Sequence, residues 1–435
     1  MTYHLISLAG AFALMGVAWL FSTHPRRLNF KTIAWGVGLQ AALAAVVFLA
    51  PASRGLFLTL NDITNSLLAS AMAGARFCFG YLSGGPAPFE ASKPQFGFIL
   101  AFQGLPTILF FSALISILYF YGIMQAVIRL FGRLFSRLMK ISGAEAVAVS
   151  SNIFVGVESM LAIRPHIRRM TRSELCLVLT AGMATVASNV LLIYVLFLRD
   201  VFPAIAGHLI SASILSAPAA VVMSKILMPE TETPETLGKA ARIHAEKEDN
   251  VFAAVISGAN SGVRLVVGIV ALLVAVLGLA ALADSLLGWG WGHAGGWLGM
   301  GGELSLKTIM GWVAYPFVLI MGVPPEDALA VSKIVGSRTI ITELAAYGDL
   351  AGAIRENAIV HPRSAVIAAY ALCGFSHIAS MSIFVGGAAA LAPERTRDIS
   401  AAGLRALAAA TLACLMTGCM AGLFYTNDGS ILLGG

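Results

Sequence analysis

Charged side chains are scarce in this chain, and their scarcity excludes a soluble protein. Asp, Glu, Lys and Arg make up 11% of its 435 residues, whereas an ordinary soluble chain carries roughly 25%. So few charges cannot cover a surface that faces water. Hydrophobic residues make up 58% of the positions, and the composition therefore indicates an integral membrane protein.

Cysteine is also scarce, and its spacing excludes a disulfide framework. The five cysteines lie singly in or beside apolar segments, without a CxxC pair, and we interpret them as buried small apolar residues. The sequence also lacks HExxH and GxSxG motifs and clustered aspartates, so it gives no support to a membrane-embedded enzyme. We therefore expect neither catalytic activity nor a cofactor.

Long apolar runs, in contrast, are abundant. A helix that spans a bilayer needs about 20 apolar residues, because the hydrocarbon core is about 30 Å thick. The runs are continuous rather than alternating, which favours helices over a β-barrel. We therefore predict an all-α polytopic membrane protein. Its eight predicted transmembrane helices lie at about 4–22, 33–50, 97–122, 175–197, 203–227, 263–287, 364–389 and 399–425.

Basic residues exceed acidic ones by a net charge of +6, but they lie in loops between the apolar runs. We therefore expect no nucleic-acid partner. Lys and Arg are concentrated in loops that fall on one side, such as 129–140 and 164–172, which indicates that this side is cytoplasmic. The amino terminus is then predicted to lie outside. The first run lacks the basic start and the cleavage site of a signal peptide, so we interpret it as a retained span.

Two other segments have patterns unlike those of spans. Between residues 51 and 95, Asn61, Asp62 and Asn65 lie among leucines, a pattern typical of an amphipathic interfacial helix, here at about 55–75. Residues 228–250 contain two prolines and many Glu and Lys, which indicates a solvated loop.

Two stretches, 141–165 and 305–347, are too apolar for loops but contain polar residues and glycine. Such residues are tolerated at membrane depth only where they face protein or a water-filled cavity. We interpret each stretch as a re-entrant hairpin with a polar tip. Each is followed by a helix interrupted by small and polar residues, at 183–190 and 373–382, and then by one further span. This repeated order predicts inverted repeats, which favour a secondary transporter with alternating access over a channel.

The hairpin tips each contain a carboxylate, Glu158 in the first and Glu343 in the second. A bare charge at this depth costs roughly 2.5 kcal/mol or more. One interpretation is a structural ion pair, for example between Glu343 and Arg338. The other is that both carboxylates accept hydrogen bonds from hydroxyl or amide donors of a polar solute.

Short polar residues in the interrupted segments suggest a second kind of site. Asn152, Thr185 and Ser188, together with freed backbone carbonyls, offer oxygens to a hard cation. The alternative is that the hydroxyls bond back to a carbonyl one turn earlier in a helix. In the second interrupted helix, Phe375 offers a ring for stacking and His377 and Ser380 offer hydrogen bonds.

Four segments resemble the concentrative nucleoside transporters. They are LPTILFFSALISILYFYGIMQ at 105–125, NIFVGVES at 152–159, ALCGF at 371–375 and GGAAALAPERTRDISAAGLRAL at 386–407. The resemblance runs from about residue 105 to 423. It implies a homotrimer in a bacterial inner membrane that imports nucleosides of the uridine, cytidine and adenosine class together with sodium. Some members of that family use protons, so proton coupling is the alternative.

The resemblance also implies a division into scaffold and transport parts. Residues 1–125 would form scaffold helices, with the interfacial helix among them. Residues 126–227 and 304–435 would form the two transport-domain repeats, each with one hairpin and two helices. Residues 228–303 would contain the cytoplasmic loop, a further scaffold helix and an interfacial segment.

The family's site residues can be placed on this sequence. The implied sodium ligands are Asn152, the carbonyl of Val155, Thr185 and the carbonyl of Val186. The implied contacts with the nucleoside are Gly156, Val157, Glu158, Ser159, Val190, Glu343, Phe375, His377 and Ser380. Among them, Glu343 would bind the ribose and the tip 156–159 would bind the base.

The sequence departs from the family's pattern in three places. The first tip reads Gly156-Val157-Glu158-Ser159 where the family has Gly-Gln-Thr-Glu, so either Glu158 or Ser159 would contact the base. The second tip reads Thr342-Glu343-Leu344 instead of Asn-Glu-Phe, and His377 replaces an Asn. The preferred base therefore does not follow from the resemblance.

Overall fold

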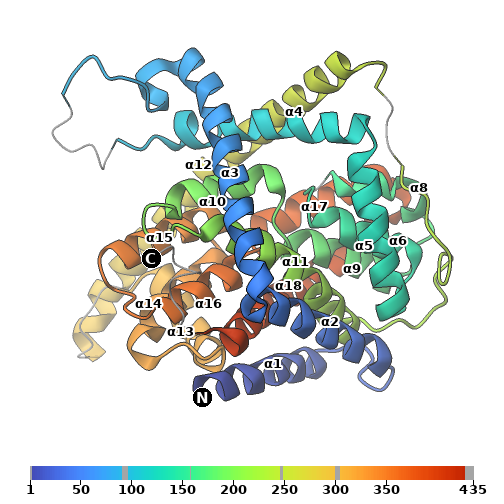
Figure 1. The fold of residues 1–435 in the computed structure, drawn as a ribbon. Coiled ribbons are helices and arrows are strands. Elements are labelled where there is room, and N and C mark those ends of the chain that lie inside the picture. Colours follow the sequence, from blue (N-terminus) through green and yellow to red (C-terminus); the bar gives the residue numbers. More distant parts are fainter. Residues whose placement is uncertain (1, 91–96, 157, 245–247, 299–303, 427–435) are drawn as a thin grey trace.

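The computed structural model describes residues 2–90, 97–156, 158–244, 248–298 and 304–426. Every element of secondary structure in these ranges is a helix (Figure 1). In Figure 1, α1 and α2 lie at the lower edge of the view, and the longer α3 rises from the end of α2 in front of other helices. The first seven elements are α1 (Thr2–Leu20), α2 (Phe30–Leu49), α3 (Pro51–Phe79), η1 (Gly80–Ser83), η3 (Leu100–Gly104), α4 (Pro106–Phe120) and α5 (Ile123–Met139).

The remaining helices form two groups around the loop 228–250. The group before it contains α6 (Gly143–Asn152), α7 (Ser159–Ala162), α8 (Arg164–Ile167), α9 (Arg172–Ala184), α10 (Ser188–Leu198) and α11 (Ile205–Leu227). The group after it contains α12 (Val251–Leu298), α13 (Leu306–Ile320), α14 (Pro325–Arg338), α15 (Glu343–Arg355), α16 (Pro362–Leu372), α17 (Ile378–Leu391), η4 (Pro393–Arg395) and α18 (Thr396–Phe424).

Seven stretches of the described residues are long and apolar enough to cross a bilayer. They are Thr2–Leu20, Phe30–Leu49, Leu100–Phe120, Arg172–Leu198, Ile205–Leu227, Val251–Trp291 and Pro393–Phe424. An all-helical membrane protein with several spans is thus confirmed. The segment predicted as one further span, 364–389, instead forms the two shorter helices α16 and α17, because the chain unwinds between Leu372 and Ile378.

Two helical hairpins lie in the stretches where reversals were predicted. In the first, α6 ends at Asn152 and the chain returns through α7 and α8. In the second, α14 ends at Arg338 and α15 begins at Glu343, with Thr342 as its N-cap. The predicted range 305–347 also included α13, which is a separate helix that packs along α14.

The two interrupted helices contact each other at their breaks. The first break lies between α9 and α10, where Thr185 and Ala187 are extended. The second lies between α16 and α17 and contains Gly374, which has φ 151°. A Cβ atom on Gly374 would lie 2.8 Å from the carbonyl oxygen of Ala184. The close approach of the two breaks therefore requires glycine at this position.

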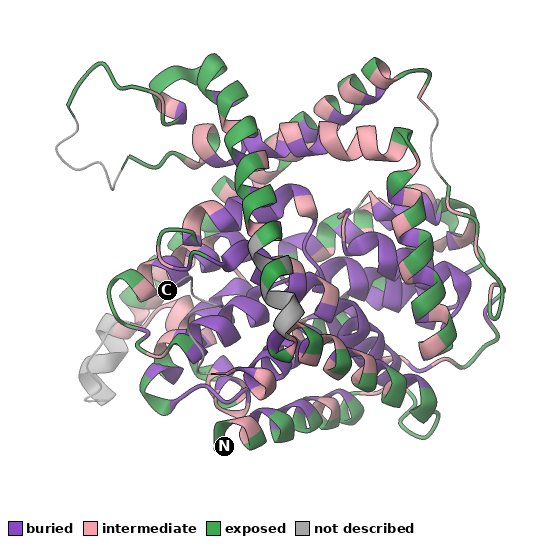
Figure 2. Cartoon of the chain, viewed as in Figure 1, coloured by how far each residue is buried: buried purple, intermediate pink, exposed green. Residues whose placement is uncertain are grey.

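Burial separates an inner set of helices from an outer one. Figure 2 shows purple, buried residues throughout α9, α11 and α18 and exposed residues along α1 and α2. The outer helix α12 is the most exposed of the candidate spans, because only 6% of the residues in its most apolar stretch are buried. It packs along α4, where a Cβ atom on Gly258 would lie 2.5 Å from the carbonyl oxygen of Ser112.

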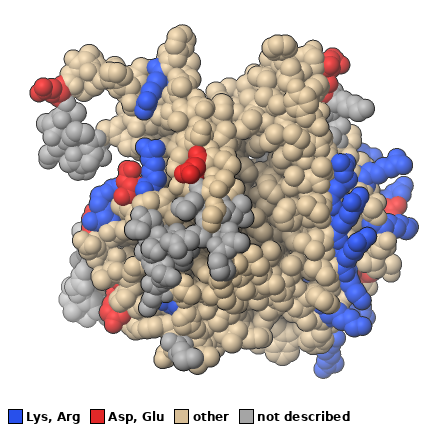
Figure 3. Space-filling view, in the orientation of Figure 1, with Lys and Arg blue, Asp and Glu red and all other residues tan. Residues whose placement is uncertain are grey.

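Polar bonds tie the first two helices to the last third of the chain. Ser7 of α1 donates to the carbonyl oxygen of Met321 at 2.7 Å and accepts from Arg363 at 2.9 Å. Gln40 of α2 donates to Thr417 of α18 at 3.3 Å. In Figure 3, most Lys and Arg residues on the visible face lie at the end where α5 and α8 are found, and the middle of that face is nearly free of charge. The same excess of Lys and Arg in residues 129–140 and 164–172 predicted that this end is cytoplasmic.

Candidate functional site

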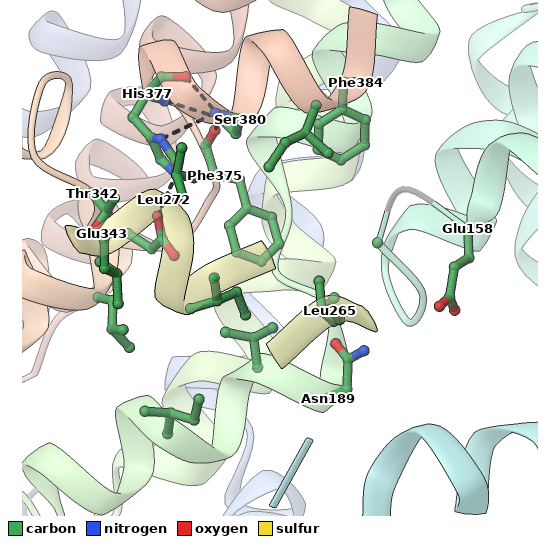
Figure 4. Close-up of a pocket in the computed structure, with 18 residues that line it drawn as sticks. Glu158, Asn189, Leu265, Leu272, Thr342, Glu343, Phe375, His377, Ser380 and Phe384 are labelled. Carbon is green, nitrogen blue, oxygen red and sulfur yellow. Dashed lines mark hydrogen bonds and ion pairs between the residues drawn. The ribbon is translucent and has the colours of Figure 1, made fainter. Parts of the chain in front are cut away.

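A pocket lies where the hairpin tips and the two interrupted helices meet (Figure 4). The empty space within it, including the open mouth, is about 830 Å³. Seven of the nine predicted nucleoside contacts line it, namely Gly156, Glu158, Val190, Glu343, Phe375, His377 and Ser380. Val157 lies outside the described residues.

Glu343 is the most enclosed acid of the pocket. It lies in the first turn of α15 and is 5% exposed. The hydroxyl of Tyr194 donates to its Oε1 at 2.8 Å, and Nε2 of His377 lies 2.7 Å from its Oε2. The ring of Tyr194 stacks on Tyr347, with centroids 4.5 Å apart. Three elements that are distant in sequence therefore hold this carboxylate.

Arg338, the alternative partner weighed for Glu343, is bound elsewhere. Its Nη1 donates to the carbonyl oxygen of Ala371 at 2.5 Å, at the end of α16. A cation near the carboxyl end of a helix stabilises the carbonyls that have no partner there. The buried ion pair between Glu343 and Arg338 is thus absent from the described residues.

His377 is held by its own helix. It is the N-cap of α17, and its Nδ1 accepts from the amide of Ser380 at 3.2 Å. A neutral imidazole with an accepting Nδ1 carries its hydrogen on Nε2, which is the nitrogen that faces Glu343. Ser380 in turn donates to the carbonyl oxygens of Phe375 and His377. Its hydroxyl therefore also orders the break in the helix.

Three polar residues of the site were not predicted from the sequence: two line the pocket, and the third, Tyr194, bonds to Glu343. Asn189 follows Ser188 in the first interrupted helix. A second polar residue in this otherwise apolar stretch could have identified it as a candidate site residue. Thr342 precedes the Glu343 acid and caps α15. The third, Tyr194, lies in the uniform apolar run of α10, which gave no signal. Aliphatic residues of α12 form part of the pocket wall, namely Leu265, Ile269, Leu272 and Leu273.

The two candidate base contacts on the first tip have different surroundings. Glu158 lines the pocket and is half-buried, and Figure 4 shows it apart from Glu343 and His377. No described residue forms a hydrogen bond or an ion pair with its carboxylate. Ser159 is buried and does not line the pocket, because its hydroxyl donates to Oδ1 of Asn152 at 2.8 Å.

Three of the four predicted sodium ligands, Asn152, Thr185 and Val186, lie on segments that hydrogen bonds join beside this tip. The hydroxyl of Thr185 donates to the carbonyl oxygen of Asn152 at 2.8 Å. The hydroxyl of Ser213 in α11 lies between the two segments. It is 3.2 Å from the carbonyl oxygen of Ile153, after α6, and 3.4 Å from that of Val186, in the break between α9 and α10. Val155 and Val186 are themselves buried. Thr185 also donates to Ala181, one turn earlier in α9, at 2.9 Å.

These oxygens fit a hard, singly charged cation. They are amide, hydroxyl and carbonyl oxygens, which suit ions such as sodium. Within the described residues, no group of three or more His, Cys, Asp and Glu side chains is placed to hold a metal. The fit therefore rests on neutral oxygens, and a transition-metal site is not indicated there.

Three family models match the chain. The model described as the Na+ dependent nucleoside transporter C-terminus matches residues 208–422, the corresponding N-terminus model matches 9–82, and a nucleoside recognition model matches 101–200. Mouse solute carrier family 28 member 3 is 36% identical over 97% of the chain, which spans 59% of the mouse protein. The uncharacterized transporter YutK of Bacillus subtilis is 35% identical, over 96% of the chain and 98% of YutK.

Solved structures match the whole fold. An inward-facing, substrate-bound structure of CNTnw has a TM-score of 0.86 and 34% identity, and covers 97% of this chain and 98% of CNTnw. An outward-facing variant of CNTnw has a TM-score of 0.86 and 33% identity, with 98% of both chains covered. Intermediate states of CNTnw match as well, with TM-scores of 0.85 to 0.87.

Proposed function

The chain belongs to the concentrative nucleoside transporter family, and we propose that it imports nucleosides across a bacterial inner membrane by symport with sodium. The observation that carries this proposal is that the pocket and the oxygen cluster share one structural part, the tip of hairpin 1. Gly156 and Glu158 of this tip line the pocket, and Asn152, at the end of α6, belongs to the oxygen cluster. An ion bound at the cluster would therefore order the tip that contacts the solute.

The bond between Ser159 and Asn152 gives this coupling a structural basis. Ser159 follows the tip directly, and its hydroxyl occupies one lone pair of the Asn152 amide oxygen. A change in the position of Asn152 on cation binding would move the tip through this bond. Binding of one ligand would then favour the other by the same factor in both directions.

For the movement itself, we propose an elevator-like step within a homotrimer. The two repeats, 126–227 and 304–435, would move together against the helix pair α4 and α12. Two observations support this proposal. The breaks of the two repeats are packed tightly together at Gly374, whereas α12 contributes only aliphatic side chains to the pocket. CNTnw, a relative of the same fold, has been solved in inward-facing, intermediate and outward-facing states.

Uptake into proteoliposomes tests the proposed function. We expect labelled nucleosides to accumulate against their gradient when sodium is high outside. An imposed proton gradient without sodium should give no accumulation. Accumulation that follows the proton gradient would replace sodium by protons as the coupling ion. Uptake that never exceeds equilibrium under either gradient would contradict symport.

Replacing Thr185 with Val should raise the sodium concentration that gives half-maximal uptake. Valine keeps the shape but removes a hydroxyl that lies among the cluster oxygens. Thr180→Val is the matched control, because Thr180 is also buried in α9 and bonds back to Cys176 one turn earlier. The sodium dependence of the control should equal that of the native protein. An equal dependence in Thr185→Val would remove Thr185 from the ion site.

Replacing His377 with Ala should weaken nucleoside binding without unfolding the trimer. The change removes the donor that faces Glu343 and one helix cap, which is worth about 1 kcal/mol. His377→Asn is the control, because Asn is a good N-cap and keeps a donor. Equilibrium binding should fall in the Ala variant and recover in the Asn variant. Full affinity in the Ala variant would assign His377 to packing alone.

A further inference from the structure

Glu158 and Asn189 leave hydrogen-bonding groups without partners in the pocket. The Glu158 carboxylate has no partner among the described residues, although it lines the pocket. Asn189 is 5% exposed, lines the same pocket, and its Oδ1 is buried without a hydrogen bond. Leaving a buried oxygen such as Oδ1 of Asn189 unsatisfied is costly, and the half-buried Glu158 carboxylate adds two more acceptors to the pocket. This end of the pocket therefore suits a ligand that supplies donors.

The position of these two residues indicates which part of a nucleoside they would meet. Glu343 and His377 lie at one end of the pocket, and in Figure 4 Phe375 and Asn189 lie between them and Glu158. The family resemblance predicts that Glu343 binds the ribose at its end of the pocket. The base, stacked near Phe375, would then extend toward Glu158 and Asn189.

We infer that Glu158 selects guanosine-type nucleosides, an inference that rests on the proposed import of nucleosides. An ionised carboxylate only accepts hydrogen bonds, and its two oxygens bind two parallel donors best. Guanine presents such a pair, the N1–H group and the neighbouring exocyclic amine. The amide of Asn189 can then pair with a further polar group of the same base.

The other common bases place an acceptor where guanine has a donor. Adenine and cytosine each offer one amine beside a ring nitrogen that carries a lone pair. Uracil offers one N–H group between two carbonyl oxygens. Each of these edges would bring a lone pair toward a carboxylate oxygen, and a site built for donors rejects such ligands strongly. A neutral glutamine, unlike glutamate, would suit adenine, because it pairs one acceptor with one donor.

Binding of analogues to the native protein tests this inference without any variant. Inosine lacks the exocyclic amine, and 1-methylguanosine lacks the N1–H group. We expect guanosine to bind about 10- to 100-fold more tightly than either analogue, because each loses one hydrogen bond to a charged group. Equal affinity for guanosine and inosine would overturn the inference.

A substitution at Glu158 tests the inference because it should reverse which of two nucleosides binds more tightly. In Glu158→Gln we expect the affinity for guanosine to fall at least 10-fold and the affinity for adenosine to rise, so that their order reverses. Glu326→Gln is the matched control, because Glu326 is an exposed acid in the first turn of α14 and does not line the pocket. The control should keep the native order.

The outcomes separate this inference from the proposed function. If the native protein and the Glu326→Gln control take up no nucleoside, the proposed function itself is wrong. If both take up nucleosides but guanosine is not preferred, or if Glu158→Gln leaves the native order unchanged, only the role of Glu158 is wrong. A preference for guanosine in the native protein together with a reversed order in the variant supports both.

Discussion

Replacing Glu343 with Gln should reduce nucleoside uptake steeply while the amount of folded protein stays near normal. The carboxylate already accepts from Tyr194 and faces Nε2 of His377, and each oxygen keeps a second lone pair for a ribose hydroxyl. Two hydrogen bonds to a charged acceptor contribute about 1.5–3 kcal/mol each. Glutamine turns one acceptor into a donor. The hydroxyl of Tyr194 can accept from that amide, so the fold should tolerate the change.

The affinity ratio of a nucleoside to its 2′,3′-dideoxy analogue isolates the ribose contacts, because both ligands carry the same base. In the native protein the ratio should be large, and in Glu343→Gln it should be near one. Free bases, which lack the sugar, should compete poorly against the native protein. Asp349→Asn is a suitable control, because Asp349 lies on the same helix but pairs with Lys307 outside the pocket. An unchanged ratio in Glu343→Gln would make Glu343 a structural partner of His377 and Tyr194.

Much of the architecture was predictable because bilayers constrain sequences strongly. Apolar runs of the right length identified the spans, and polar residues at membrane depth identified hairpins and interrupted helices. Segment 364–389 was predicted as a span with an interruption near its middle, and in the structure it divides there. The bounds of the second hairpin were less predictable, since α13 closely precedes α14 and packs along it, although its residues are more apolar than those of α14 and α15.

The side-chain partners were less predictable than the elements. The hydroxyl of Tyr194 reaches Glu343 from 149 residues away, and nothing in the apolar run of α10 indicates that contact. Arg338 was a reasonable partner for Glu343 by sequence distance, but the end of α16 lies closer to its guanidinium. Ser159 was predicted as a nucleoside contact by alignment with the family's tip, yet its hydroxyl is used within the hairpin. Such choices depend on tertiary packing.

The base of the first hairpin contains a buried charge network that the sequence analysis did not single out. Lys225 of α11 lies 2.5 Å from Oε1 of Glu145 and 3.5 Å from Oε2 of Glu230, and it donates to Ser173 at 2.9 Å. Glu145 also completes the N-terminal capping box of α6. The side chains of Lys225 and Glu145 are 8% and 1% exposed. The network therefore joins the start of the hairpin to the end of α11.

A second capping box connects to the same network. Glu174 completes the box at the start of α9, with Thr171 as its N-cap. It also accepts from the hydroxyl of Ser142, the N-cap of α6, at 2.5 Å. Acids near helix amino termini are favoured by the helix dipole, but here they lie close together. Lys225 is the cation that offsets their mutual repulsion.

Replacing Lys225 with Met should therefore destabilise the protein strongly. Methionine keeps an apolar stem of similar length but leaves the buried Glu145 without its cation, and breaking a buried pair in this way costs about 3–5 kcal/mol. Arg169→Met is the control, because Arg169 pairs with Glu235 at 2.9 Å while both side chains are at least half exposed, and exposed pairs are worth about 0–1 kcal/mol. The melting temperature in detergent should fall far more for Lys225→Met than for the control.

A second substitution distinguishes charge imbalance from lost packing. If the unpaired carboxylate is the cause, Glu145→Gln in the Lys225→Met background should recover part of the melting temperature, since residues in one network are not additive. The amide of glutamine can still accept from the backbone amide of Ser142, which donates to Glu145 at 2.8 Å in the native protein. A double variant that is less stable than Lys225→Met alone would mean that the stem of Lys225, and not its charge, holds the base of hairpin 1 in place.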